Sequence, residues 1–249
     1  MIETLRALCP TARGATFGAP VPGRGCWNGS VEAEACARPA HRLRNSRRAV
    51  VPIGSRAYDN RRLRAIAREV VGPEVLAIGY AQLPNPHLRR FHTVGVDLVK
   101  PLSPSGYAEE IQGDAMNLAA CVSGRRFNTI VFGELIEHLE VPYQFLRSLH
   151  PFLAEGGRIV LSTPNPLGFP QVICEMLNIR RFYYTTEHHY SFPRRWMVRM
   201  LEATGFEVIA VRSVGLQLVC LAPPCPKFLS HQLVYVARQR GPRAEKEAR

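Results

Sequence analysis

Short apolar runs alternate with segments of helical spacing from about residue 58 to residue 238. The runs are rich in Val, Ile and Leu and are bounded by Gly, Pro or polar residues, as buried strands usually are. Six of the predicted strands cover residues 74–79, 91–99, 127–135, 157–165, 206–214 and 231–239. A further short strand, the third in chain order, is predicted to end within residues 111–116.

Three other segments carry apolar residues at helical spacing. The predicted helices cover residues 58–72, 142–157 and 191–205. We expect Gly72, the glycines at 156 and 157, and Gly205 to end them, and Ser191 to cap the third. The alternation predicts an α/β protein with an open, doubly wound, mostly parallel sheet and helices on both faces. Ligands of such sheets bind at the carboxyl ends of the strands.

The first 55 residues lack this periodicity and are rich in Gly, Pro, Ala and Arg. That composition predicts a disordered leader, which is either an Arg-rich targeting segment or an extension without function. The acidic residues Glu3, Glu32 and Glu34 weaken the targeting interpretation. We therefore expect one globular domain over residues 56–238 and a basic tail over residues 239–249.

The net charge of +12 is concentrated at the two ends of the chain. Residues 1–64 carry +8 and residues 238–249 carry +3, so the middle of the chain carries only +1. A nucleic-acid-binding domain would instead place Lys and Arg on its folded face. We therefore expect solvated basic tails and no specific nucleic-acid partner, although weak, salt-sensitive contact of the tails with RNA or acidic lipid stays open.

The cysteines indicate neither a disulfide framework nor a zinc site. Seven are scattered along the chain without a CxxC pair, and Cys220 with Cys225 has no partner at zinc-site spacing. We expect reduced thiols and no metal. No apolar run reaches the roughly 20 residues that span a bilayer, and no secretory signal is present, so we expect a cytoplasmic protein without a membrane span. The oligomeric state is not indicated.

Polar residues follow the second, third and fourth predicted strands, where a ligand would bind. Asp97 ends the second strand, and its carboxylate can accept hydrogen bonds from both hydroxyls of a ribose or cap the following segment. Asp114 follows the third strand, where it can accept from an adenine amine or form a Gly-Asp turn. Glu134, Glu137 and His138 follow the fourth strand, where a transferred group and its acceptor would meet.

The run from residue 127 to residue 165 resembles the second half of a class I S-adenosylmethionine-dependent methyltransferase domain. That family typically shows a Phe-Asp-x-Val strand, a Glu-x-x-Glu-His turn, and a helix ending in Gly-Gly before a strand closed by Pro-Asn. The matching residues are Phe127, Glu134, Glu137, His138, Gly156, Gly157, Pro164 and Asn165, with Asn128 in place of the Asp. "VGVDL", "GDA" and "HHYSFPRRWMVRMLEATGFEV" also match, so the resemblance covers roughly residues 58–238.

The resemblance implies a seven-stranded Rossmann-like sheet whose last strand is antiparallel, with S-adenosyl-L-methionine as cofactor. Asp97 would hold the ribose diol, and Asp114 with the Ala115 backbone would hold the adenine. Gly79 would let the first loop approach the methionine end of the cofactor, and the segment at Glu134 would border that end.

The loop after the first predicted strand departs from the family pattern. Ala77 stands in place of the family's acidic residue, and Ala81 and Leu83 stand where the second and third glycines usually are. The nucleoside half of the site therefore matches the family better than the methionine half. The same shortage of glycines disfavours a nicotinamide oxidoreductase, which needs the backbone close to a pyrophosphate.

A hydroxyl acceptor of a methyl group must also lose its proton. His138 and His188 are the catalytic candidates, with His189 beside them; a turn-ordering role for His138 and a surface-loop position for the other two are the alternatives. We expect residues 165–192 to cover the acceptor pocket. Four of their aromatic residues would line that pocket or pack on the sheet: Tyr183, Tyr184, Tyr190 and Phe192.

We therefore expect a methyltransferase that uses S-adenosylmethionine and acts on a small-molecule acceptor, with O-methylation favoured. The alternative is a non-catalytic binding or scaffolding protein that keeps this fold and has lost part of the cofactor site. The nearly neutral middle of the chain does not favour nucleic-acid methylation.

Overall fold

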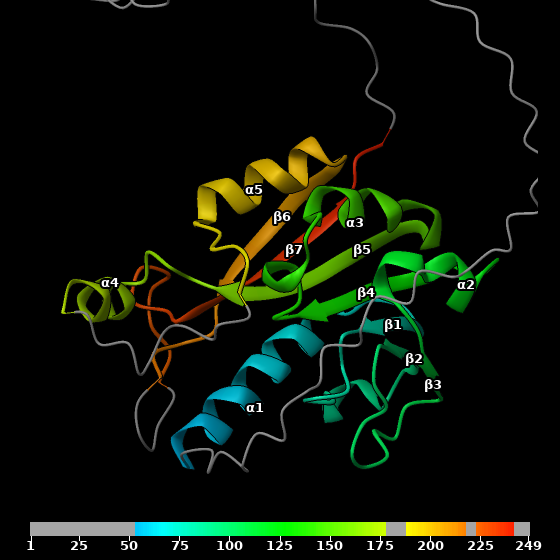
Figure 1. Ribbon diagram of the computed structural model, residues 1–249, viewed down its shortest axis with the longest axis horizontal. Coiled ribbons are helices and arrows are strands. Elements are labelled where there is room, and N and C mark those ends of the chain that lie inside the picture. Colours follow the sequence, from blue (N-terminus) through cyan, green and yellow to red (C-terminus); the bar gives the residue numbers. More distant parts are fainter. Residues whose placement is uncertain (1–52, 178–187, 218–222, 242–249) are drawn as a thin grey trace, which may run out of the picture. The chain divides into compact units, whose positions relative to one another are not determined.

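The computed structural model describes residues 53–177, 188–217 and 223–241 (Figure 1). Residues 1–52 of the predicted leader, Tyr183 and Tyr184 of the predicted cap, and most of the predicted tail lie outside these ranges. The last three residues of the predicted leader, 53–55, belong instead to the first described helix, Ile53–Arg68. No helix within the described ranges is long and apolar enough to cross a membrane.

Seven strands form one mixed sheet in the order β3-β2-β1-β4-β5-β7-β6. They are β1 (Glu74–Ile78), β2 (His92–Asp97), β3 (Glu109–Gln112), β4 (Phe127–Gly133), β5 (Leu153–Pro164), β6 (Phe206–Ser213) and β7 (Gln232–Gln239). β7 is antiparallel to both β5 and β6, and the other pairs are parallel. The predicted doubly wound sheet with an antiparallel last strand is confirmed.

β1 lies where the winding of the sheet reverses. It pairs with β2 on one side and with β4 on the other, and β3 and β5 continue outward from these neighbours. Ile78 at the end of β1 is in register with Val96 and Phe132. A crevice opens beyond the carboxyl ends of the strands at such a reversal. The fold therefore directs the search for a ligand site to the region beyond Ile78.

Helices cover both faces of the sheet. The described α-helices are α1 (Ile53–Arg68), α2 (Leu118–Val122), α3 (Pro142–Ser148), α4 (Phe169–Met176) and α5 (Arg194–Ala203). Four 3-10 turns accompany them: η1 (Pro86–Leu88), η2 (Ala115–Asn117), η3 (Ile136–His138) and η4 (His150–Phe152). Figure 1 shows α1 on one side of the sheet and α3 and α5 on the other.

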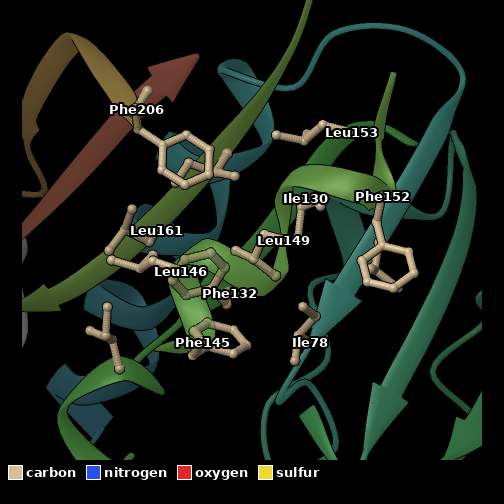
Figure 2. Close-up of a cluster of buried hydrophobic side chains, with 14 of the residues drawn as sticks. Ile78, Ile130, Phe132, Phe145, Leu146, Leu149, Phe152, Leu153, Leu161 and Phe206 are labelled. Atoms are coloured by element: carbon tan, nitrogen blue, oxygen red, sulfur yellow. The ribbon is translucent and has the colours of Figure 1, made fainter. Parts of the chain in front are cut away.

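Side chains of the central strands alternate between two buried clusters, one on each face. Leu76 of β1 and Phe132 of β4 pack with residues of α2, α3 and α5. Figure 2 shows Phe132 beside Phe145 and Leu146 of α3. Val75 of β1 and Val131 of β4 point the other way and pack with residues of α1. Because both faces are buried, these strands are apolar at nearly every position, which made them recognisable as short apolar runs.

The connection between β1 and β2 contains no α-helix. Residues 79–91 hold only the turn η1, whose Leu88 is buried. Parallel neighbours of this kind are usually joined through a crossover helix that covers one face of the sheet. Here α1, which precedes β1, covers that face with Tyr58, Ile66 and Ala67.

The predicted helix over residues 142–157 is wrong in its second half. α3 ends at Ser148, η4 follows, and β5 begins at Leu153. Pro151 within η4 has no N–H to donate to a carbonyl of the preceding turn, so the α-helix does not continue through it. Gly156, with φ +70°, and Gly157 lie within β5, beside a register irregularity between β4 and β5, and not at a helix end.

The predicted cap of the last helix is also wrong. Pro193, and not Ser191, is the N-cap residue of α5, and no side chain makes a capping hydrogen bond there. Because a proline disfavours helical geometry in the preceding residue, α5 cannot begin as early as Ser191 would require. The other end is as predicted, since α5 ends at Ala203 and Gly205 follows with φ +91°.

Replacing Phe145 of α3 by Ala is expected to lower the free energy of unfolding by about 3–5 kcal/mol. The Phe145 side chain is fully buried and its ring meets that of Phe132 edge to face, with 5.3 Å between centroids. The matched control is Tyr143→Ala on the same helix, which should cost less than about 0.5 kcal/mol because Tyr143 is 45% exposed. Equal losses for both variants in urea unfolding would contradict this description of the core.

Candidate functional site

A cavity of about 580 Å³ opens at the carboxyl ends of β1 and β4. Its walls come from α1, β1, the loop after β1, the end of β2, β4 and the turn after β4. Of the predicted site residues, Gly79, Asp97, Glu134 and His138 line it. The structure therefore brings together four residues that are spread over 60 positions of the sequence.

The loop after β1 is held by one glycine and a buried aromatic side chain. Gly79 has φ +67°, and a Cβ there would lie 3.2 Å from the Leu135 side chain, so a larger residue would be strained. Tyr80 then turns its ring over Gly95 of β2, where an added Cβ would overlap it, and packs against Tyr107 with 5.1 Å between ring centroids. Aromatic packing fixes this loop where the family pattern has further glycines.

Asp97 joins this loop to the end of β2. Its Oδ2 accepts a hydrogen bond from the Ala81 backbone N–H at 2.7 Å, and its Oδ1 accepts from the Val99 N–H at 3.2 Å. The residue is half-buried and lines the cavity. Because an ionised carboxylate has about four lone-pair sites, the two backbone contacts leave acceptor capacity for a ligand.

Glu134, directly after β4, is the centre of a polar network. Its Oε1 lies 3.4 Å from Nη1 of Arg62 and accepts from the Ser162 hydroxyl at 3.1 Å. Its Oε2 accepts from the Gln232 side-chain amide at 2.8 Å. Burial raises the pKa of the Glu134 carboxyl, whereas the Arg62 guanidinium and these hydrogen bonds act in the opposite direction. Nη2 of Arg62 also lies 3.6 Å from Oδ1 of Asp59, and burial likewise raises the pKa of the Asp59 carboxyl.

The backbone of Glu134 is strained. Among the described residues it is the one non-glycine with a positive φ, +52°, a conformation that costs most side chains about 1–2 kcal/mol. Its N–H donates to the Ser162 carbonyl at 2.9 Å, which ties the turn to β5. Strain of this kind persists where the surrounding structure over-determines a residue, and it is concentrated at functional sites.

The turn after Glu134 brings Glu137 and His138 next to a distant segment. Glu137 is 1% exposed, and burial together with the charge of Glu134 raises its pKa to about 8. The rings of His138 and His188 meet edge to face with 4.6 Å between centroids. The Glu137 carbonyl accepts from the backbone N–H groups of His189 at 2.9 Å and Tyr190 at 3.2 Å. Both predicted catalytic histidines thus share one location, with His138 on the cavity wall.

A methyltransferase-domain family matches residues 54–211, which is more than half of the chain. The chain belongs to this family. S-adenosylmethionine is the cofactor that such methyltransferases use. No curated protein matches the chain in sequence.

Solved structures of other methyltransferases share the fold. An S-adenosylmethionine-dependent methyltransferase from Thermotoga maritima, a possible histamine N-methyltransferase, is 14% identical with a TM-score of 0.57, over 76% of this chain and 92% of that one. One from Archaeoglobus fulgidus is 16% identical with a TM-score of 0.56, over 72% and 92%. Magnesium protoporphyrin IX methyltransferase from Synechocystis PCC 6803, with bound S-adenosylhomocysteine, is 13% identical with a TM-score of 0.52, over 79% and 90%.

The cavity of this methyltransferase offers the kinds of group that S-adenosylmethionine requires. The cofactor carries a ribose diol, an ammonium group and a carboxylate. The carboxylates of Asp97 and Glu134 suit the first two, because each can accept hydrogen bonds from hydroxyl or ammonium groups. Arg62 lines the cavity, and its guanidinium group can donate to a carboxylate; its Nε is buried and has no hydrogen-bond partner among the described residues.

Two predicted adenine contacts lie outside the lining of this cavity. The Asp114 side chain is exposed and accepts from the Met116 N–H at 2.8 Å, so it caps the turn η2 that begins at Ala115. The Gly113 N–H donates to the Asp97 carbonyl at 2.8 Å, which places the start of η2 beside the end of β2. In this structure Asp114 therefore has the turn-forming contact that was its alternative role.

Several cavity residues were missed by sequence reasoning. Arg62 and Asp59 lie on α1, which was recognised only by its apolar spacing, and nothing in the sequence separates Arg62 from its neighbours Arg61 and Arg64. Tyr80 and Tyr107 were missed because their packing joins a loop to a distant residue. Of the predicted acceptor cap, Arg180, Arg181, Tyr183 and Tyr184 lie outside the described residues. Tyr190 is exposed and stacks on Phe192.

The strain at Glu134 is measurable with a matched pair of variants. Glu134→Ala and Glu134→Gly both remove the carboxylate, but only glycine adopts φ +52° without steric cost. We expect the Gly variant to unfold with a free energy about 1 kcal/mol higher than that of the Ala variant. Urea unfolding of the two proteins compares them directly. An Ala variant as stable as the Gly variant would show that the backbone relaxes and stores no strain.

Proposed function

We propose that this methyltransferase binds S-adenosylmethionine in the cavity beyond β1 and transfers its methyl group to a small-molecule acceptor, with an oxygen as the favoured acceptor atom. The observation that supports the proposal is the arrangement of two carboxylates, Asp97 and Glu134, at the carboxyl ends of β2 and β4, the strands that flank β1. Gly79, directly after β1, lies between them.

The residues have separate binding roles in this proposal. Asp97 accepts hydrogen bonds from the ribose hydroxyls while it keeps its contact with Ala81. Glu134 accepts from the ammonium group of the methionine end, and the Arg62 guanidinium donates to the carboxylate of that end. Ala115 and Asp114 stay the proposed contacts of the adenine, supported by the hydrogen bond that links η2 to the end of β2.

The bound cofactor supplies an electrophilic methyl group on a sulfonium. The protein contributes alignment of the acceptor with that methyl group and exclusion of water, effects that account for several kcal/mol in well-oriented reactions. For a hydroxyl acceptor, the His138 imidazole on the cavity wall is placed to take the proton as the new carbon–oxygen bond forms. The segment 188–192, held against the turn at Glu137, borders the same region.

Calorimetric titration with S-adenosylmethionine and S-adenosylhomocysteine tests this proposal without knowledge of the acceptor. We expect saturable binding of one molecule per chain. Asp97→Asn should weaken it at least tenfold, about 1.4 kcal/mol, because the amide accepts fewer hydrogen bonds from hydroxyls than a carboxylate does.

The matched control is Glu109→Gln on the neighbouring strand β3, whose exposed carboxylate pairs with Arg125 at 2.8 Å and does not line the cavity. Its affinity should equal that of the wild type. If Asp97→Asn binds S-adenosylmethionine as tightly as the wild type does, the proposed contact between Asp97 and the ribose is wrong. If the wild type binds neither compound at millimolar concentration, the scaffolding alternative replaces the enzyme.

A further inference from the structure

Three potential metal ligands meet beside the proposed cofactor site. A carboxylate oxygen of Glu137 and one ring nitrogen each of His138 and His188 lie within 4.8 Å of one another. His138 lines the cavity, so this cluster forms part of its wall. The set holds two imidazoles and one carboxylate, all of them first-choice ligands of divalent transition metals.

The buried carboxylate of Glu137 is the second observation that points to a ligand. Glu137 is 1% exposed, and its Oε1 is buried without a hydrogen-bond partner among the described residues. The Thr163 hydroxyl approaches the other oxygen, Oε2, only to 3.5 Å. A buried carboxyl group without a partner either stays protonated, or it is paired with a cation or coordinates a metal that stabilises its ionised form.

The backbone holds this cluster together. The turn η3 positions Glu137 and His138, and the Glu137 carbonyl accepts from the N–H groups of both His189 and Tyr190. The Tyr190 hydroxyl also donates to the Glu140 carbonyl at 3.0 Å. Three hydrogen bonds thus fix the segment that follows His188 against the turn that carries the other two ligands.

We propose that Glu137, His138 and His188 bind one divalent first-row transition-metal ion. Ligand atoms around such an ion are roughly 3–3.5 Å apart, because each lies about 2.1 Å from the metal. Side-chain rotation that draws the three groups slightly closer therefore completes the site. Three protein ligands leave at least one coordination position open, as in sites that bind a water or a substrate oxygen.

The ligand set also selects the class of ion. Mg²⁺ and Ca²⁺ prefer oxygen ligands, and here two of the three ligand atoms are imidazole nitrogens. The site therefore suits Co²⁺, Mn²⁺, Fe²⁺ or Zn²⁺. No metal was expected from the sequence, because the cysteines lack partners at zinc-site spacing and His188 lies 50 positions after His138.

An ion in this site changes the role of His138. As a ligand, His138 cannot also take the acceptor proton, and an open coordination position would instead be available to the acceptor oxygen. This consequence rests on the proposed methyltransferase function, whereas metal binding itself does not.

The test is titration of the full chain, first treated with a chelator and then freed of it, with Co²⁺. Binding is followed by calorimetry and by the visible absorption of the bound ion. We expect one ion per chain, and at least tenfold weaker binding for Glu137→Gln and His188→Ala. Mg²⁺ should not compete at equal concentration. The matched control is His189→Ala, which removes the adjacent, exposed imidazole and should leave the affinity unchanged.

Each outcome decides the proposal. Absence of stoichiometric binding, equal affinity of the wild type and both ligand variants, or equal loss in His189→Ala would overturn it, and tight Mg²⁺ binding would overturn the assigned class of ion. If Glu137→Gln does not fold, as judged by thermal unfolding, His188→Ala decides alone. A second titration measures the binding of S-adenosylhomocysteine to the metal-free protein. Loss of cofactor binding and loss of metal binding are therefore observed independently of each other.

Discussion

The polar contacts of Glu134 join four parts of the protein at one point. The carboxylate contacts Arg62 of α1, Ser162 of β5 and Gln232 of β7. Glu134 itself directly follows β4. A partly buried ion pair does not by itself stabilise a fold, because desolvation offsets much of the attraction. Here, however, each carboxylate oxygen also accepts a hydrogen bond, which offsets part of the desolvation cost. The interaction thus specifies how α1 sits over the carboxyl ends of the strands.

This placement of α1 matters because the connection after β1 has no helix of its own. α1 must cover the face that a crossover helix usually covers, and its apolar residues do so through Ile66 and Ala67. Apolar packing alone is non-directional. The contact between Arg62 and Glu134 adds direction, and Arg62 also lines the cavity. One helix therefore closes the core and supplies a side chain to the proposed site.

The sequence predicted the sheet well and the site only in part. Strands buried on both faces are apolar at nearly every position, so their pattern is visible without knowledge of their partners. Asp97 and Glu134 were recognisable because they follow such strands. Arg62, Tyr80 and Tyr107 were not, because their importance arises from contacts between distant segments. The predicted helix boundaries at Pro151 and Pro193 were wrong because apolar spacing continues through both positions, whereas a proline lacks the N–H of a helical hydrogen bond and restricts the residue before a helix start.

The loop after β1 shows how a departure from a family pattern can be compensated. Glycines bring a loop backbone close to a ligand, and this chain keeps one, Gly79, where the positive φ is needed. Tyr80 packs on Gly95 and Tyr107, and the Ala81 N–H donates to Asp97. The loop is therefore fixed to β2 by the same carboxylate that is proposed to hold the ribose. Because ribose binding and loop position share this one side chain, the missing glycines do not by themselves argue that the cofactor site is lost.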